Sequence, residues 1–496
     1  MAQRAEGNAN DPAGATLLCL SAFKASRVTQ TANLLLVTFD QWRGDWGDPG
    51  RPVVPLPALT TLAREGVVAS RCYTSSPHCV PARFSWLTGL APSQLGLTRN
   101  ESTTLPADAP SLVRELQRRG WRTELVGKSH WSSHAKPGDL VKNLPLLKAL
   151  GFDHAQEVAG PRALRRMACG LTRAWQEAGW LERQRDDLEK RYEKGLDPQA
   201  WAVRPSVLPL ALYPDVWIAE RALERLKALP ANQPWLLWVS FVGPHEPFDT
   251  PAPWAGSHSP ESLPQAWPPP RWLDQLPDTS ELARLGKRWQ GKLNAEAVQA
   301  CRADYADHLR LLDDQLARLL DALANREDGR NTAVLATADH GELLGDGGAL
   351  YKGAFLEGAV RVPWVYRPPG GCPPRRWCRP LPLTGLLARS LAELSAGGRT
   401  NALEAWVQRC RGTVVEFGEE LLVLQGSRKL VLDRHGRPLW ASQPELDPGE
   451  QRNLLSKPRW LWQLNPAWWQ LRWRASSEWR RRRSTHWLWR DLRPQG

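Results

Sequence analysis

Residues 32–41 read ANLLLVTFDQ, an apolar run that stops abruptly at Asp40 and Gln41. Three further apolar runs also end in polar side chains: WRTELVGKSH (121–130), QPWLLWVSFVGPHEPF (233–248) and NTAVLATADHGE (331–342). Between the runs, residues 218–229 and 305–319 carry apolar side chains at a spacing near 3.6, which indicates helices. Near-continuous apolar strands that alternate with amphipathic helices predict an α/β fold, with a large, mostly parallel sheet sandwiched by helices.

The polar residues that follow these runs are candidates for a functional site. In parallel sheets of this kind, ligands bind beyond the carboxyl ends of the strands, and all four polar clusters fall there. We therefore expect one site to collect side chains from all four clusters: Asp40, Gln41, Lys128, His130, His245, Asp339 and His340.

A second candidate for a functional residue is the cysteine in SSPHCVPARFSWLTG (75–89). Pro81 suits the first turn of a helix and Gly89 suits its end, which places Cys79 at or just before the helix N-terminus. That position lowers the pKa of a thiol and favours anions. A cysteine nucleophile needs a nearby base, and the adjacent His78 points elsewhere on most backbones, so these residues leave the use of the thiol open.

Cysteine spacing and hydropathy exclude several classes of protein. The eight cysteines are spread along the 496 residues without a Cys-x-x-Cys pair, which excludes a dense disulfide framework and argues against a structural zinc site. The longest apolar runs are far shorter than the roughly 20 residues of a membrane span. The weak apolar segment ATLLCLSAF (15–23) follows no basic region, so we expect a cytoplasmic protein.

The formal net charge of +13 is concentrated at the C-terminus. Residues 457–496 hold ten lysines or arginines and two acids, together with eight of the 27 tryptophans. One interpretation is a helix whose tryptophans pack on the body of the protein while its arginines face water. The alternative is a surface that binds an anionic membrane or a nucleic acid.

Composition also suggests the domain organisation. We expect a small C-terminal antiparallel β subdomain, because short β-rich runs after residue 412 are broken by Gly-Ser and His-Gly turns. The predicted division is an N-terminal extension (1–30), a catalytic domain (31–385), the antiparallel subdomain (386–456) and a basic, Trp-rich tail (457–496). Within the catalytic domain we expect a helical insertion at about 157–212 and a Pro-rich insertion at about 251–292.

The pattern Cys-x-Pro-x-Arg at Cys79, followed by Leu-Thr-Gly, resembles the signature of the sulfatase family. The rest of the chain carries further motifs that are similar to those of the family, in the same order. Asp40-Gln41 is similar to its first metal motif, Gly127-Lys128-x-His130 to its Gly-Lys-x-His motif, and Pro244-His245 to its Pro-His motif. Asp339-His340-Gly341 with Tyr351-Lys352-Gly353 resembles the second metal motif and the distal lysine, and LDPGEQRNLL (446–455) resembles the segment that closes the C-terminal subdomain. The resemblance covers roughly residues 31–456 and implies an alkaline-phosphatase-like fold.

The resemblance implies that Cys79 does not act as a thiol. In this family a formylglycine-generating enzyme oxidises the cysteine to formylglycine (3-oxoalanine) and reads the residues that match Pro81 and Arg83. One hydroxyl of the hydrated aldehyde attacks sulfur and expels the alcohol, and the second hydroxyl then loses its proton so that sulfate is ejected. Ala82 replaces the commoner serine, and we expect conversion to survive this change.

The resemblance also implies roles for the other residues. A divalent metal, Ca²⁺ in the first place with Mn²⁺ or Mg²⁺ as alternatives, would bind to Asp40, Gln41, Asp339 and His340. Arg83 would hold the formylglycine hydrate and His130 one of its hydroxyls, and Lys128, Lys352 and Asn100 would bind the sulfate oxygens. His245, together with Lys352, would protonate the leaving alcohol.

Two alternatives keep the fold and change the activity. The Asp-Gln and Asp-His pairs look closer to the choline-sulfatase and phosphonate-monoester-hydrolase branches, and a tetrahedral phosphorus ester makes similar demands on a site. A phosphonate monoester or phosphodiester hydrolase is therefore one rival. The other is an inactive sulfatase fold whose basic tail binds polyanions. Residues 345–348 read Gly-Asp-Gly-Gly, where relatives commonly have Gly-Asp-His-Gly. We expect the missing histidine to change the substrate pocket rather than the metal site.

Overall fold

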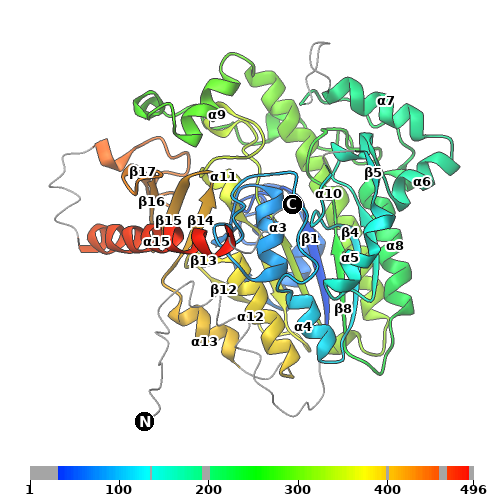
Figure 1. Ribbon diagram of the computed structural model, residues 1–496. Coiled ribbons are helices and arrows are strands. Elements are labelled where there is room, and N and C mark those ends of the chain that lie inside the picture. Colours follow the sequence, from blue (N-terminus) through cyan, green and yellow to red (C-terminus); the bar gives the residue numbers. More distant parts are fainter. Residues whose placement is uncertain (1–31, 135–136, 193–200, 398–400, 457–465, 491–496) are drawn as a thin grey trace, which may run out of the picture.

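The computed structural model describes residues 32–134, 137–192, 201–397, 401–456 and 466–490, and side chains of the last helix as far as residue 481 (Figure 1). The predicted N-terminal extension (1–30) and residues 457–465 of the predicted tail lie outside the described residues.

An eight-stranded sheet forms the centre of the fold, in the order β12-β2-β11-β9-β1-β8-β4-β6. β11 pairs antiparallel with both of its neighbours, and the other pairs in the sheet are parallel. The strands are β1 (Asn33–Phe39), β2 (Val67–Ala69), β4 (Arg122–Lys128), β6 (His154–Val158), β8 (Trp235–Ser240), β9 (Thr332–Ala338), β11 (Trp364–Arg367) and β12 (Arg375–Trp377).

The four apolar runs of the sequence form the four adjacent strands β9, β1, β8 and β4. β1 and β9 are buried at every position, because strands in the middle of a sheet covered on both sides meet no water. Thr38 in β1 aligns with Thr337 in β9 and with Ser240 in β8, so the strands end at the same level. The residues that follow them therefore meet at one edge of the sheet.

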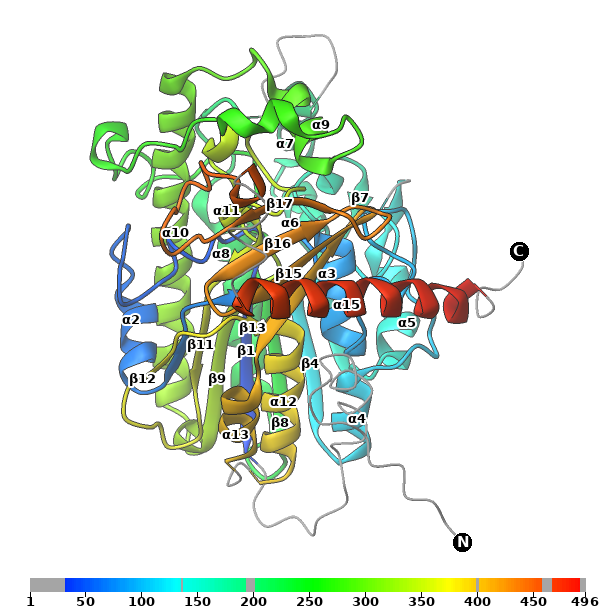
Figure 2. The same ribbon diagram turned by 90° about the vertical axis from the view of Figure 1, so that its left-hand side faces the viewer.

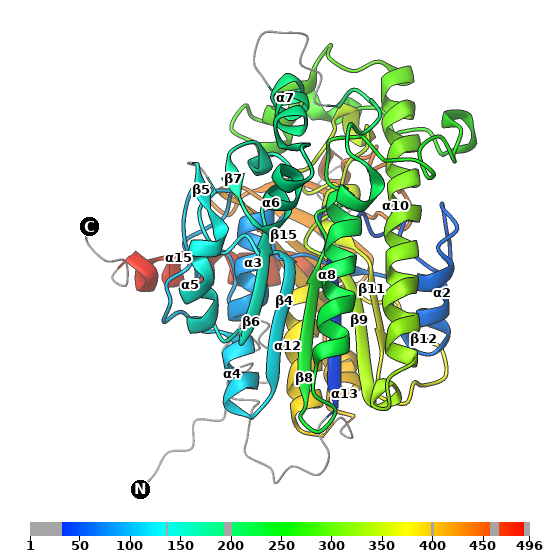
Figure 3. The same ribbon diagram turned by 90° about the vertical axis from the view of Figure 1, so that its right-hand side faces the viewer.

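Helices cover both faces of this sheet. α2 (Pro57–Arg64), α8 (Pro214–Ala228) and the long α10 (Ala295–Ala324) lie on one face (Figure 3). α3 (Cys79–Thr88), α4 (Leu112–Arg118) and α12 (Leu383–Ser395) lie on the other (Figure 2). The predicted apolar stripes of α8 and α10 are buried, and the predicted α/β fold is confirmed.

Beyond the main sheet, the predicted C-terminal antiparallel sheet is also confirmed. Its strands are β14 (Gly412–Phe417), β15 (Glu420–Gln425), β16 (Arg428–Leu432) and β17 (Pro438–Ser442). Helix α13 (Ala402–Arg409) precedes them, and helix α15 (Pro466–Arg490) packs against β15 and β16. Two small sheets pair β3 (Cys72–Tyr73) with β10 (Arg361–Val362) and β13 (Leu381–Pro382), and β5 (Gly138–Asp139) with β7 (Met167–Ala168).

The two segments predicted as insertions are largely helices and loops above the sheet in the view of Figure 1. Residues 157–212 include α6 (Gly170–Glu177) and α7 (Leu181–Tyr192), and α5 (Leu144–Ala149) precedes them. Residues 251–292 include α9 (Glu281–Trp289), and α11 (Glu357–Val360) follows later in the chain. Short 3₁₀ helices lie at 140–143, 163–165, 210–212, 260–262, 271–275, 329–331, 346–348 and 454–456. None of the described helices is long and apolar enough to span a membrane.

A glycine at the end of β4 allows the close approach of β8. Gly127 has φ +110°, and a Cβ at this position would lie 1.9 Å from the carbonyl oxygen of Ser240. Gly127→Ala should therefore lower the free energy of unfolding by clearly more than the about 1–2 kcal/mol expected for a positive φ alone. Urea unfolding of the purified protein measures this loss.

Gly120→Ala is the matched control, because Gly120 also has a positive φ (+83°) but no atom lies within 4 Å of its added Cβ. Equal losses of stability in the two variants would contradict the role assigned to the close approach at Gly127.

Candidate active site

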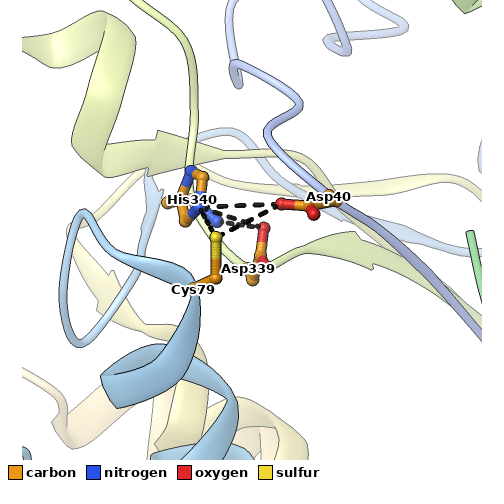
Figure 4. Close-up of side chains that lie close together, drawn as sticks. All are labelled: Asp40, Cys79, Asp339 and His340. Carbon is orange, nitrogen blue, oxygen red and sulfur yellow. Dashed lines mark hydrogen bonds and ion pairs between the residues drawn. The ribbon is translucent and has the colours of Figure 1, made fainter. Parts of the chain in front are cut away.

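Four buried side chains from three parts of the chain converge at the carboxyl edge of the sheet (Figure 4). Asp40 follows β1, Asp339 and His340 follow β9, and Cys79 is the first residue of α3. One candidate ligand atom of each lies within 4.8 Å of all the others. His340 Nε2 is 3.7 Å from Asp40 Oδ1 and 3.7 Å from Asp339 Oδ1. The structure thus brings Asp40, Asp339 and His340 together at the ends of β1 and β9, with Cys79 of α3 beside them.

The thiol of Cys79 lies among positive charges. The predicted helix is confirmed: α3 begins at Cys79 and ends before Gly89, whose φ of +71° is the left-handed cap. Cys79 Sγ is 3.1 Å from His340 Nε2 and 3.4 Å from Lys352 Nζ. Burial raises the pKa of the thiol, but Lys128, Lys352 and His340 outweigh it and hold the pKa well below its usual value. The site therefore favours negative charge at this position.

Two buried cations compensate the two buried carboxylates. Arg83 donates from Nε to Asp339 Oδ2 (2.7 Å), and Lys128 forms an ion pair with Asp40. Arg83 also donates from Nη1 to the carbonyl oxygen of Lys128 (2.7 Å), so the two pairs are linked. Burial lowers the pKa of Arg83, but the charges of Asp339 and Asp40 outweigh this effect, so the pKa lies above its usual value. Among the described residues, Arg83 Nη2 has no hydrogen-bond partner, which leaves one donor for a bound group.

Gln41 lies beside this cluster and is held by two carboxylates that the sequence analysis missed. Its Nε2 donates to Glu246 Oε2 (3.0 Å) and to Glu342, while its Oε1 accepts from Lys352. Glu246 and Glu342 follow His245 and Gly341 directly, so each is one residue beyond a recognised motif. Their position just after a strand end was the available signal.

The same carboxylates carry different pKa shifts. Burial raises the pKa of Glu246, but Arg162, His245 and Lys352 outweigh it and lower the pKa to about 2. Burial raises the pKa of Glu342, and the Glu246 charge adds to this effect. Because like charges at close range disfavour double ionisation, the geometry keeps Glu246 as the anion next to His245.

The remaining predicted residues surround the cluster. His245 is buried, and its Nδ1 donates to the carbonyl oxygen of Glu246 (2.8 Å) and lies 3.1 Å from Glu246 Oε2. His130 contacts the thiol of Cys79, and its ring stacks on His134 with centroids 4.9 Å apart. Asn100 is exposed, and its Oδ1 accepts from the backbone N–H of Val80, so it is placed at the start of α3 rather than in the cluster.

The donor set fits a divalent metal. His340 donates from Nδ1 to the carbonyl oxygen of Gly341 (3.0 Å), which leaves Nε2 as the ring nitrogen that faces Cys79 Sγ and the two carboxylates. Burial lowers the pKa of His340, but Asp339 outweighs it and raises the pKa, so the cluster stabilises a positive charge at Nε2. Two carboxylates, one imidazole and the adjacent Gln41 amide are ligands that Ca²⁺, Mn²⁺ or Mg²⁺ can use.

Comparison with known proteins places this site in a family. The family model described as Sulfatase matches residues 32–380. An arylsulfatase of Clostridium perfringens is 27% identical over 343 residues, which cover 68% of this chain and 69% of that protein. A choline-sulfatase of Rhizobium meliloti is 26% identical over 462 residues, which cover 87% of this chain and 84% of that protein. The crystal structure of phosphonate monoester hydrolase of Agrobacterium radiobacter superposes with a TM-score of 0.69 at 22% identity, covering 92% of this chain and 96% of that chain.

The chain belongs to the sulfatase family, since the match to the family model spans more than half of its length. Its activity class is accordingly that of a sulfuric ester hydrolase, on an alkaline-phosphatase-like fold. Sulfatases generally use a metal ion and a formylglycine, and in this structure Cys79 and the candidate metal ligands occupy one cluster.

Loss of one carboxylate tests the metal site. Asp339→Asn keeps the size of the side chain but removes a charge that faces both His340 and Arg83. We expect the affinity for the metal to fall at least about a hundredfold, and hydrolysis to fall with it. Elemental analysis of dialysed protein and an aryl sulfate assay measure the two effects.

Asp314→Asn, on the partly exposed side of α10, is the control and should retain both metal and activity. Normal metal content in the Asp339→Asn protein would show that the ion binds elsewhere.

Proposed function

We propose that this protein hydrolyses a sulfate ester to an alcohol and inorganic sulfate, with a formylglycine derived from Cys79 as the nucleophile. The observation that carries the proposal is the convergence of Cys79 with Asp40, Asp339 and His340 at the carboxyl edge of the sheet. A sulfate ester carries charge on its non-bridging oxygens, and attack moves further charge onto the leaving oxygen. Cationic groups directed at residue 79 meet that demand.

Formylglycine, when present at position 79, supplies the hydroxyl that attacks sulfur. Lys352 Nζ lies 3.4 Å from Cys79 Sγ, where it can bind a sulfate oxygen, and Lys128 borders the same atom. Arg83 holds Asp339 in place through its Nε. Its Nη2 has no hydrogen-bond partner among the described residues and can therefore donate to the ester. These residues bind and orient the ester and stabilise its charge.

The leaving alcohol needs a proton, and His245 is placed to give it. Because Nδ1 of His245 donates to the carbonyl oxygen of Glu246, Nε2 is the nitrogen available to the leaving group. The Glu246 carboxylate, whose pKa is lowered to about 2, remains ionised at neutral pH and lies 3.1 Å from Nδ1 of His245, which orients the ring. This pair is therefore suited to general acid catalysis.

The proposed cofactor is a divalent cation, and Ca²⁺ is the first choice because most of the donors are oxygen atoms. Asp40, Asp339 and His340 would hold it, with Gln41 from the adjacent position. Such an ion would neutralise charge on the bound sulfate. Mn²⁺ and Mg²⁺ are the alternatives, and the imidazole ligand suits Mn²⁺.

The proposed partners are the sulfate ester, a formylglycine-generating enzyme and, for the basic tail, an anionic surface whose kind is argued below. Cys79, Pro81 and Arg83 are all buried in the folded chain. We therefore infer that the maturation enzyme acts on this segment before the fold closes over it.

The decisive experiment is peptide mass spectrometry of residue 79. Protein produced together with an active formylglycine-generating enzyme should carry an aldehyde in place of the Cys79 thiol and should react there with hydrazine reagents. Cys79→Ser should be inactive, because an unactivated hydroxyl lacks the second oxygen needed to eject sulfate. Fully active protein with an unmodified thiol would overturn the proposed nucleophile.

Cys169→Ala and Cys301→Ala are the matched controls, because both thiols are buried but lie outside the cluster. They should retain the aldehyde and the activity. The same preparation should be assayed on matched aryl sulfate, phosphonate and phosphodiester substrates, and a higher kcat/KM for a phosphorus ester would favour the rival activity.

Leaving groups of different acidity test the role of His245. His245→Ala should slow esters of poor leaving groups by about 10²–10⁴, whereas activated nitrophenyl esters should be affected far less. The dependence of kcat on the pKa of the leaving alcohol is the measurement. His154→Ala, at a partly exposed strand end remote from the cluster, should leave that dependence unchanged. An equal loss for all leaving groups would assign His245 to substrate binding.

A further inference from the structure

Helix α15 presents two chemically different faces. Its inner face carries Trp468, Leu471 and Ala475, which are buried against the C-terminal sheet. The sheet contributes an apolar surface that is not part of the main core: Leu421, Val423, Leu430, Leu432 and Ala441. Figure 2 shows the helix lying across these strands at the surface of the molecule. The first interpretation of the tail, a helix packed on the body, therefore describes this inner face.

The outer face of α15 carries Trp469, Trp473 and Arg480, and Arg472 lies at its border; all four side chains are exposed. Successive residues of a helix are 100° apart, so Trp469, Trp473 and Arg480 fall on the side opposite to the packed one, and Arg472 falls at its border. The side chains of Trp469 and Trp473 are 63% and 64% exposed and lie one helical turn apart. Because the inner face fixes the helix on the sheet, both indoles are held outside the protein.

The charge of this region is strongly positive. Residues 457–496 carry ten basic and two acidic residues, and four consecutive arginines occupy 480–483. Among the described residues, the other exposed large hydrophobic side chains are Val141, Val203, Leu210, Trp267 and Leu446, and none of them belongs to α15. The outer face of α15 thus joins exposed tryptophans to arginines on one rigid element.

We propose that the outer face of α15 binds the surface of an anionic lipid bilayer, with the helix parallel to the membrane plane. Tryptophan rings prefer the boundary between headgroups and acyl chains, and arginines attract the phosphate and carboxylate groups of anionic lipids. Both indoles project from the convex surface of one helix, whereas proteins that bind single strands combine stacking aromatic rings with a basic groove. The chemistry therefore fits a flat lipid surface better than a nucleic acid.

The test is co-sedimentation of the full chain with phosphatidylcholine vesicles, with and without phosphatidylserine. Binding should require phosphatidylserine and should weaken as salt is added, because the attraction is screened. Arg472→Gln with Arg480→Gln should lower the partition coefficient about thirtyfold. Trp469→Ser with Trp473→Ser should also lose binding to anionic vesicles, while the temperature of unfolding stays unchanged because these side chains are exposed.

Two control proteins separate this effect from general changes in charge or hydrophobicity. Arg64→Gln with Arg118→Gln removes two exposed arginines from α2 and α4, and Trp267→Ser removes a partly exposed indole far from α15 in sequence. Both controls should bind vesicles as the unaltered protein does. The inference does not depend on the proposed chemistry, so all of these proteins should hydrolyse a soluble aryl sulfate at the normal rate.

Three results would overturn the proposal. The first is equal binding to neutral and anionic vesicles. The second is binding to single-stranded DNA with none to vesicles, which would assign the face to nucleic acid. The third is a concentration-dependent dimer, seen by analytical ultracentrifugation without lipid and abolished by the Trp469→Ser and Trp473→Ser pair, which would make a second copy the occupant.

Discussion

The burial of two carboxylates at adjacent strand ends is the constraint on which the site depends. Asp40 and Asp339 are fully buried, and an unpaired buried carboxylate would be costly enough to bind a proton instead. Lys128 and Arg83 prevent this by pairing with them, and both cations are themselves buried. Removing either cation would leave a buried charge without its partner, at a cost of about 3–5 kcal/mol.

This pairing also links elements that are far apart in the sequence. Arg83 comes from α3, Asp339 follows β9, and Lys128 ends β4, so one hydrogen-bonded group joins a helix on one face to two strands. The C-terminal sheet contributes as well, since the ring of Phe417 packs against His78, next to Cys79. The position of Cys79 and the stability of the fold therefore depend on the same contacts.

The sequence predicted the parts of this arrangement that have a local pattern. The apolar runs identified β1, β4, β8 and β9, and their parallel order brought Asp40, Lys128, His245 and Asp339 to one edge. The sequence did not predict that Glu246 and Glu342 belong to the site. Their role arises from a shared contact with Gln41, which is 205 and 301 residues away from them in the chain. The two faces of α15 could not be assigned either, because tryptophan occurs on both and only the packing against β15 and β16 separates them.

The pairing of β1 with β9 has a consequence for the timing of synthesis. β9 is the neighbour of β1 in the sheet, yet its residues leave the ribosome about 250 positions after Cys79. At 5–20 residues per second, this delay is on the order of tens of seconds. Until then Asp339 and His340 have not been synthesised, so they cannot enclose the thiol of Cys79. The late position of β9 in the chain, together with its place beside β1 in the sheet, therefore sets the earliest time at which the site around Cys79 can close.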